Sequence, residues 1–150
     1  MFKFELEAVL KLRESIEENS KRLLGQALDE EQKILNQIAL LKKINRQYQS
    51  DIKTLLETSG TMQLKEIQSI QQALLHNETT IESLSEKLKK AHDCVLEKQE
   101  QYQNDLRNRK ILSSLKERQK EDYLREENLK ESLLLDELVS YKYAVKKESQ

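Results

Sequence analysis

The chain has 150 residues, of which 37% are hydrophobic and 5% aromatic, with no proline and two glycines. This apolar content is too low to fill the core of one compact domain of that length, so we expect a narrow helical seam instead. The 26 basic and 27 acidic side chains nearly cancel and are interleaved, which argues against nucleic acid or an anionic membrane as the main partner.

A first long helix is predicted over residues of about 3–57, because apolar side chains recur there at helical spacing. Gly25 interrupts this helix and should cost about 1 kcal/mol relative to alanine, which paired neighbours can absorb. The expected seam starts at Leu6, Val9, Leu12 and Ile16, passes through Leu23 and Ala27, and becomes regular at Ile34, Ile38, Leu41, Asn45, Tyr48, Ile52 and Leu55.

A turn is predicted at about residues 58–61, where the only clear helix-stopping stretch of the chain lies. Gly60 can adopt the left-handed conformation that ends a helix. Ser59 or Thr61 can cap the start of the next one. The local chemistry therefore predicts that the chain folds back on itself at this point.

A second helix is predicted over about residues 62–146, and its periodicity is the clearer of the two. Its seam positions alternate three and four residues apart, which is the heptad pattern of a coiled coil. They are Ile67, Ile70, Leu74, Asn77, Ile81, Leu84, Leu88, Ala91, Val95, Lys98 and Tyr102. The predicted fold is therefore all-α, a single antiparallel coiled-coil hairpin over residues 1–150 with the longer helix at the C-terminus.

Antiparallel pairing about the turn predicts that contacting residues have numbers adding up to roughly 120, so that Leu6 lies near Leu112 to Leu115. The first helix then ends before the second, and the segment from Arg118 to Lys147 has no partner within the chain. Unpaired apolar residues on a helix invite a partner, although folding back, fraying or self-association are alternatives. The apolar residues of this segment are Tyr123, Leu124, Leu129, Leu133, Leu134, Leu135, Leu138, Val139, Tyr141 and Tyr143.

Polar residues occupy the expected seam between Lys98 and Glu126. One interpretation is a loosely paired stretch that is mobile until a partner binds it. The other is a shifted register that turns Leu106, Ile111 and Leu115 inward. The polar seam positions are Lys98, Asp105, Arg109, Lys116 and Gln119.

The motifs of catalysis and cofactor binding are missing from the sequence. Gly25 and Gly60 are too far apart for a phosphate-binding loop. His76 and His92 lack the glutamate three residues earlier that di-iron helical bundles supply. Cys94 has no histidine at helical spacing to activate it, so we interpret it as a small structural residue. We therefore expect no enzyme, no cofactor and no metal.

The apolar runs are too short to cross a bilayer, for which about 20 residues are needed, so we expect no direct membrane insertion. The residues from Met1 to Arg13 mix charged and apolar side chains, unlike a cleavable secretory signal. A single cysteine fits a reducing compartment. We therefore expect a cytoplasmic protein.

One stripe near the turn is wider than a two-helix seam requires. Gln37 and Ile44 lie beside the heptad positions Leu41 and Tyr48, at spacings of four, three and four residues. Both a binding surface and ordinary core filling are consistent with this pattern.

The chain opens with the residues FKFELEAVLKLRE at positions 2–14. They resemble the N-terminal signature of the FliJ family, coiled-coil components of the flagellar type III export apparatus. The resemblance implies a non-enzymatic stalk, peripheral at the cytoplasmic face of the flagellar basal body, that binds and promotes a hexameric export ATPase. It also implies contacts with the cytoplasmic part of the export gate membrane protein and with substrate chaperones.

Carried onto this chain, the resemblance implies gate binding by Gln37, Leu41, Ile44 and Tyr48. It implies ATPase binding by Phe4, Leu6, Leu10 and Arg13, and the unpaired apolar face adds Leu133, Leu134, Leu138 and Tyr141. Two alternatives stay open: a coiled-coil chaperone or adaptor that holds export substrates or other clients, and the equivalent stalk of a virulence secretion system.

Overall fold

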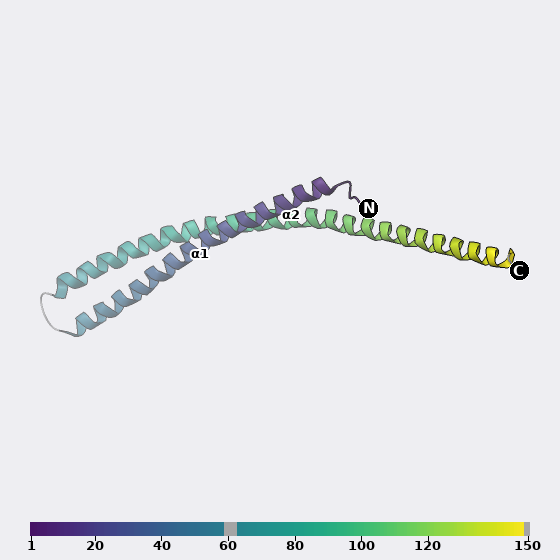
Figure 1. Cartoon of the computed structure of the whole chain (residues 1–150). Coiled ribbons are helices and arrows are strands. Elements are labelled where there is room, and N and C mark those ends of the chain that lie inside the picture. The colour runs from purple at the N-terminus through teal and green to yellow at the C-terminus, as the bar shows by residue number, and fades with distance from the viewer. Residues whose placement is uncertain (59–62, 149–150) are drawn as a thin grey trace. The chain divides into compact units, whose positions relative to one another are not determined.

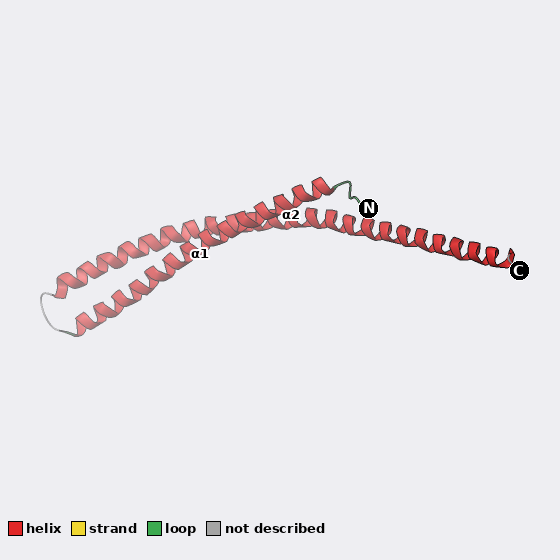
Figure 2. Ribbon diagram, viewed as in Figure 1, coloured by secondary structure: helices red, strands yellow, loops and turns green. Residues whose placement is uncertain are grey.

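The computed structural model describes residues 1–58 and 63–148, and nearly all of them are helical. Helix α1 spans Glu7–Glu57 with 51 residues, and helix α2 spans Gln63–Glu148 with 86 residues (Figure 1). Over the described residues the secondary structure consists of helix with short loops (Figure 2). The predicted all-α hairpin with a longer second helix is confirmed.

The end of α1 is described as far as Thr58. Its hydroxyl donates hydrogen bonds to the main-chain carbonyls of Thr54, at 3.3 Å, and of Leu55, at 3.2 Å. Carbonyls of the last helical turn have no partner within the helix, so this side chain helps to satisfy them. The predicted capping roles of Ser59, Gly60 and Thr61 lie outside the described residues.

The chain forms two structural units, and each of the two helices is divided between them. One is the hairpin unit, Glu18–Gln103, and the other is the end unit, which combines Met1–Glu17 with Asn104–Gln150. Each unit therefore contains one stretch of α1 and one stretch of α2.

The seam of the hairpin unit follows the predicted heptads. Ala27, Ile38 and Val95 are buried, with 9%, 8% and 6% of their surface exposed. The seam positions of α2 predicted from Ile67 to Tyr102 are all buried or half-buried, as are those of α1 predicted from Leu23 to Leu55. The heptad prediction is confirmed throughout this unit.

Contacts within each unit show that the paired stretches run antiparallel. The numbers of Asn45 and Asn77 add up to 122 and those of Glu31 and His92 to 123, both in the hairpin unit. In the end unit Glu17 faces Arg109, and these numbers add up to 126. The register is thus shifted by a few residues from the predicted value of roughly 120.

The predicted seam is wrong at Leu6, Val9 and Leu12, whereas Ile16 is half-buried as expected. Leu6, Val9 and Leu12 are 39%, 41% and 59% exposed, whereas Leu10 is only 4% exposed. Counting back from Ala27 in steps of three and four residues leads to Ser20, Glu17, Arg13 and Leu10, all of which are buried or half-buried. Three of these four positions are polar, so the spacing of apolar residues did not reveal the register.

The polar stretch of the α2 seam does face the seam. Asp105 is 6% exposed, and Arg109 and Lys116 are half-buried, while Ile111 is 66% exposed. Gln119 is exposed, so the prediction fails at that position. Leu106 and Leu115 are half-buried, as the alternative interpretation of a shifted register expects, but Ile111 is exposed. The shifted register is therefore wrong at Ile111, and the heptad register continues through the charged residues as far as Lys116.

Candidate binding surfaces

The first residues of the chain are fastened to the middle of α2. The rings of Phe2 and Tyr123 lie with their centroids 5.7 Å apart, and the amino group of Met1 donates a hydrogen bond of 2.8 Å to the Tyr123 hydroxyl. Aromatic pairs at this separation attract each other beyond the area that they bury. The prediction that Tyr123 belongs to the unpaired segment is therefore wrong.

Two ion pairs connect the stretches of the end unit. The Arg109 guanidinium donates to both carboxylate oxygens of Glu17, at 2.6 and 3.2 Å. The Lys116 Nζ atom lies 2.8 Å from Glu7 Oε2. A two-point contact between guanidinium and carboxylate fixes orientation better than a single one. The polar seam therefore has specific partners.

The N-terminal residues assigned to ATPase binding point mostly inward. Phe4 and Leu10 are 8% and 4% exposed, and Arg13 is half-buried. The Glu7 amide donates a 3.2 Å hydrogen bond to the Phe4 carbonyl, which holds the chain where α1 begins. Leu6, at 39% exposed, is the member of this set that offers most of its side chain to a partner.

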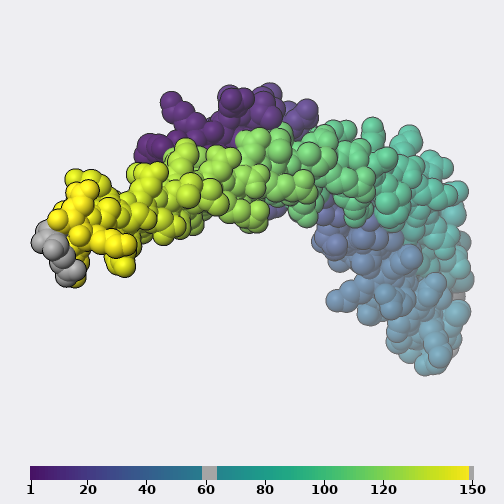
Figure 3. Space-filling model, turned by 90° about the vertical axis from the view of Figure 1, so that its right-hand side faces the viewer, coloured from purple at the N-terminus to yellow at the C-terminus, as the bar shows by residue number. Residues whose placement is uncertain are grey.

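The C-terminal residues of the set lie on an open helix face. Leu134, Leu138 and Tyr141 are 58%, 57% and 69% exposed, and the end of α2 extends beyond the N-terminal residues that lie along it (Figure 3). Eighteen residues make about five turns of helix, so Tyr141 lies on the same face as Tyr123. Leu134 lies in the same way on the face of Lys116. Both residues therefore continue the face that the chain's own N-terminal stretch covers earlier on α2.

Leu133 is also exposed, at 55%, but belongs to another face. It precedes Leu134 by one residue, which turns its side chain by roughly 100° around the helix. The four C-terminal candidates thus do not form one stripe.

The stripe near the turn is only partly open. Gln37 is exposed, whereas Leu41, Ile44 and Tyr48 are half-buried. Within this stripe the seam carries Asn45, whose side-chain oxygen accepts a hydrogen bond of 2.9 Å from the Asn77 amide. Leu41 and Tyr48 therefore serve the seam, and Gln37 is the residue most available to a partner.

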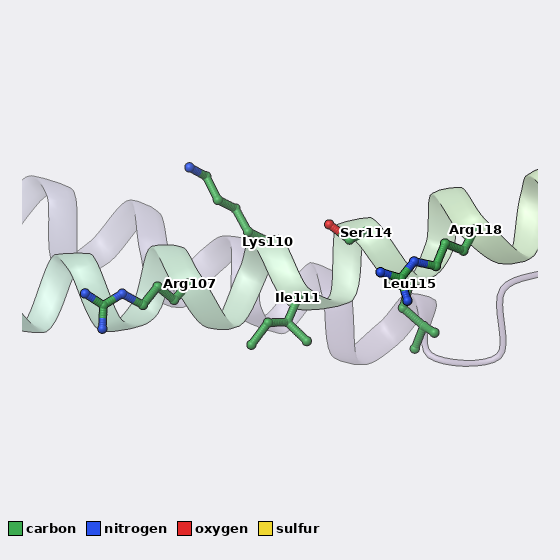
Figure 4. Close-up of a pocket in the computed structure, with 6 residues that line it drawn as sticks. All are labelled: Arg107, Lys110, Ile111, Ser114, Leu115 and Arg118. Atoms are coloured by element: carbon green, nitrogen blue, oxygen red, sulfur yellow. The ribbon is translucent and has the colours of Figure 1, made fainter.

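The spacing of apolar residues in the sequence did not indicate the groove that lies on α2. It has a volume of about 570 Å³ and lies on the end unit (Figure 4). Ile111 and Leu115 point to the same side of the helix, and the side chain of Arg118 extends back towards Leu115. The lining residues are Arg107, Lys110, Ile111, Ser114, Leu115 and Arg118. The available signal was local charge, since residues 107–120 contain six basic side chains and one acidic one.

Neither a metal-binding group nor a membrane-spanning helix is found among the described residues. They contain no group of three or more histidine, cysteine, aspartate or glutamate side chains placed to hold a metal ion. Cys94 is exposed and borders a shallow groove beside Ala91 and Lys98. Neither helix has a stretch that is long and apolar enough to span a bilayer.

Comparison with known proteins agrees with the resemblance seen at the N-terminus. The family model described as "Flagellar FliJ protein" matches residues 2–148, which is almost the whole chain. Neither the curated proteins nor the solved structures include a match. The long second helix, the hairpin and the opening motif are thus found in a chain that belongs to the FliJ family of flagellar proteins.

Proposed function

We propose that this chain is the non-enzymatic central stalk of the flagellar type III export apparatus. In this role it binds and promotes the hexameric export ATPase at the cytoplasmic face of the basal body, and it connects the ATPase to the export gate and to substrate chaperones. Family membership supports the export-related part of the proposal. The stalk role itself is supported by the exposed apolar residues at the end of α2.

One observation carries the proposal. Beyond Tyr123, α2 continues as a helix with exposed apolar residues, and two of them, Leu134 and Tyr141, lie on the face that the N-terminal stretch covers earlier on the helix. An exposed apolar face at the end of a helix can pack against apolar side chains of a partner. A stalk on the axis of a ring offers such a face to successive subunits.

The mechanism requires no catalytic residue on this chain. A ligand shifts an equilibrium between conformations only as far as its affinities for them differ. A helix that presents an apolar face to a ring contacts the subunits unequally, and it therefore favours the open state in some subunits and the closed state in others. This bias promotes the cycle of nucleotide binding and hydrolysis in the ATPase.

The ATPase test uses the rate of ATP hydrolysis by the export ATPase with equimolar stalk. We expect Leu134→Ala with Leu138→Ala to reduce the stimulation severalfold. The matched control is Leu135→Ala with Val139→Ala, which removes two equally exposed aliphatic side chains, 62% and 66%, from another face. Equal stimulation by both double variants and the unchanged chain would refute the role of this face.

A second test addresses the gate. We expect Leu41→Ala with Tyr48→Ala to weaken binding to the cytoplasmic part of the gate protein while ATPase stimulation is retained. Since both residues are half-buried, Gln37→Lys, at an exposed position, gives a variant that leaves the seam intact. If Leu41→Ala with Tyr48→Ala abolishes both interactions and Gln37→Lys changes neither, these residues belong to the core and not to a gate surface.

A further inference from the structure

The groove on α2 holds basic side chains for which the described residues supply no acidic partner. Arg109 and Lys116, on the neighbouring seam face, are paired with Glu17 and Glu7. Among the described residues, by contrast, the groove residues Arg107, Lys110 and Arg118 take part in no ion pair. The groove therefore combines uncompensated positive charge with the exposed aliphatic side chain of Ile111.

The next stretch of the same helix has the complementary chemistry. Residues 121–137 contain seven acidic and two basic side chains. Leu129 is 64% exposed and lies 18 residues after Ile111, which places both on one face because 18 residues complete about five turns. Asp136 follows Arg118 by the same interval. Along this face Arg107 and Arg118 are followed by Asp122 and Asp136, and each half also carries an exposed aliphatic residue, Ile111 or Leu129.

We propose that this groove binds the acidic segment, residues 121–137, of a second copy of this chain. Two copies of α2 that pair antiparallel about a two-fold axis near residue 120 bring each basic half onto the other copy's acidic half. Interfaces of this kind are self-complementary, so the same contacts form twice. Residues whose numbers add up to about 240 then face each other, which sets Ile111 on Leu129 and Arg118 on Asp122. Lys110 lies opposite Lys130 in this register, so the attraction between charges comes from Arg118 and Asp122.

The composition of the groove favours a protein segment over a nucleic acid. Single-stranded nucleic acids bind through bases stacked on aromatic rings as well as through phosphate contacts. None of the residues that line the groove is aromatic, and Ile111, 66% exposed, stands among its cations. A helix that carries acidic residues and a leucine can pair with the cations of the groove and also pack on Ile111.

The inference does not depend on the proposed stalk function. The dimer uses the face of Ile111 and Leu129, whereas the ATPase is assigned to the face of Leu134 and Tyr141. Loss of dimerisation therefore leaves the ATPase test interpretable, and loss of stimulation leaves the dimer test interpretable.

Sedimentation equilibrium of the full chain tests the proposal. We expect a monomer–dimer equilibrium whose dissociation constant rises with salt, since the contacts are charged and lie near the surface. Arg118→Asp should raise the dissociation constant about tenfold, and so should Asp122→Arg, because each change sets like charges opposite each other twice in the dimer. Among the described residues Asp122 pairs with Arg125 alone, at 3.9 Å on the exposed surface, so little internal stability is lost.

The combined variant Arg118→Asp with Asp122→Arg restores the facing pairs and should return the dissociation constant to that of the unchanged chain. Lys120→Asp, which changes charge in the same segment outside the groove, serves as the matched control, and circular dichroism verifies helicity. A chain that stays monomeric at every concentration overturns the proposal, as does a combined variant that remains impaired. Retention of a fluorescent single-stranded RNA by a monomeric chain, lost on Arg118→Asp, likewise overturns it in favour of nucleic acid.

Discussion

The hydrogen-bonded pair Asn45 and Asn77 offers the sharpest test of how the hairpin unit is specified. The amide of Asn77 donates to the side-chain oxygen of Asn45 at 2.9 Å, and both residues are half-buried on the seam among apolar neighbours. A polar pair of this kind fixes the register of a coiled coil at a cost in stability. Changing one residue should therefore act differently from changing both.

We expect Asn45→Leu or Asn77→Leu alone to lower the free energy of unfolding by about 1 kcal/mol, because the remaining amide loses its partner in a half-buried position. The two changes together should raise it by about 1–2 kcal/mol, since each leucine gains part of the 1.5–3 kcal/mol of full burial. Urea denaturation followed by circular dichroism measures all four chains. If the single changes each stabilise the chain by half as much as the double change, the hydrogen bond contributes nothing to specificity and the reasoning is refuted.

Three further predictions concern single positions. Leu10→Ala should cost about 2 kcal/mol, whereas Leu12→Ala should change the free energy of unfolding by less than about 0.5 kcal/mol, because only Leu10 is buried; equal costs in urea denaturation would contradict the observed register. Gly25→Ala should raise the stability by about 1 kcal/mol, since an added Cβ meets nothing within 4 Å, and an unchanged melting temperature would contradict this. Tyr123→Ala should release the N-terminal residues from α2 by removing the ring that packs on Phe2, which limited proteolysis would detect as faster cleavage there than in the unchanged chain.

The sequence predicted the fold well wherever apolar residues mark the seam. From Ile67 to Val95 the heptad positions of α2 are almost all aliphatic, and each lies where the pattern indicated. The pattern misled at Leu6, Val9 and Leu12, whose apolar spacing also satisfies a helix period but belongs to an exposed face. Pattern reasoning assumes that apolar residues are buried, and it fails where a seam is built from ion pairs such as Glu17 with Arg109.

The candidate surfaces were predicted less completely for a different reason. Exposure of Leu134, Leu138 and Tyr141 followed from the unequal helix lengths, which the turn position made evident. Burial of Phe4 did not follow, because the sequence does not reveal how the residues before α1 pack on α2. The basic groove was hidden by the balanced charge of the whole chain, since that balance is reached between segments and not within each one.

The arrangement of faces around α2 links the two proposals. Tyr123 and Tyr141 share one face, Ile111 and Leu129 share another, and each pair is separated by 18 residues, or about five turns. A helix whose apolar residues kept one period throughout would have one apolar stripe. Helix α2, with 86 residues, carries two partly apolar stripes over its last part. Side chains on separate faces can be selected independently, so one helix can meet a ring with one face and a second copy of itself with the other. A chain that carries Arg118→Asp together with Leu134→Ala and Leu138→Ala tests this independence. If the two faces are independent, its free energy of dimerisation changes by the sum of the changes measured for Arg118→Asp alone and for the two leucine changes alone. A departure from this sum would show that one partner occupies both faces.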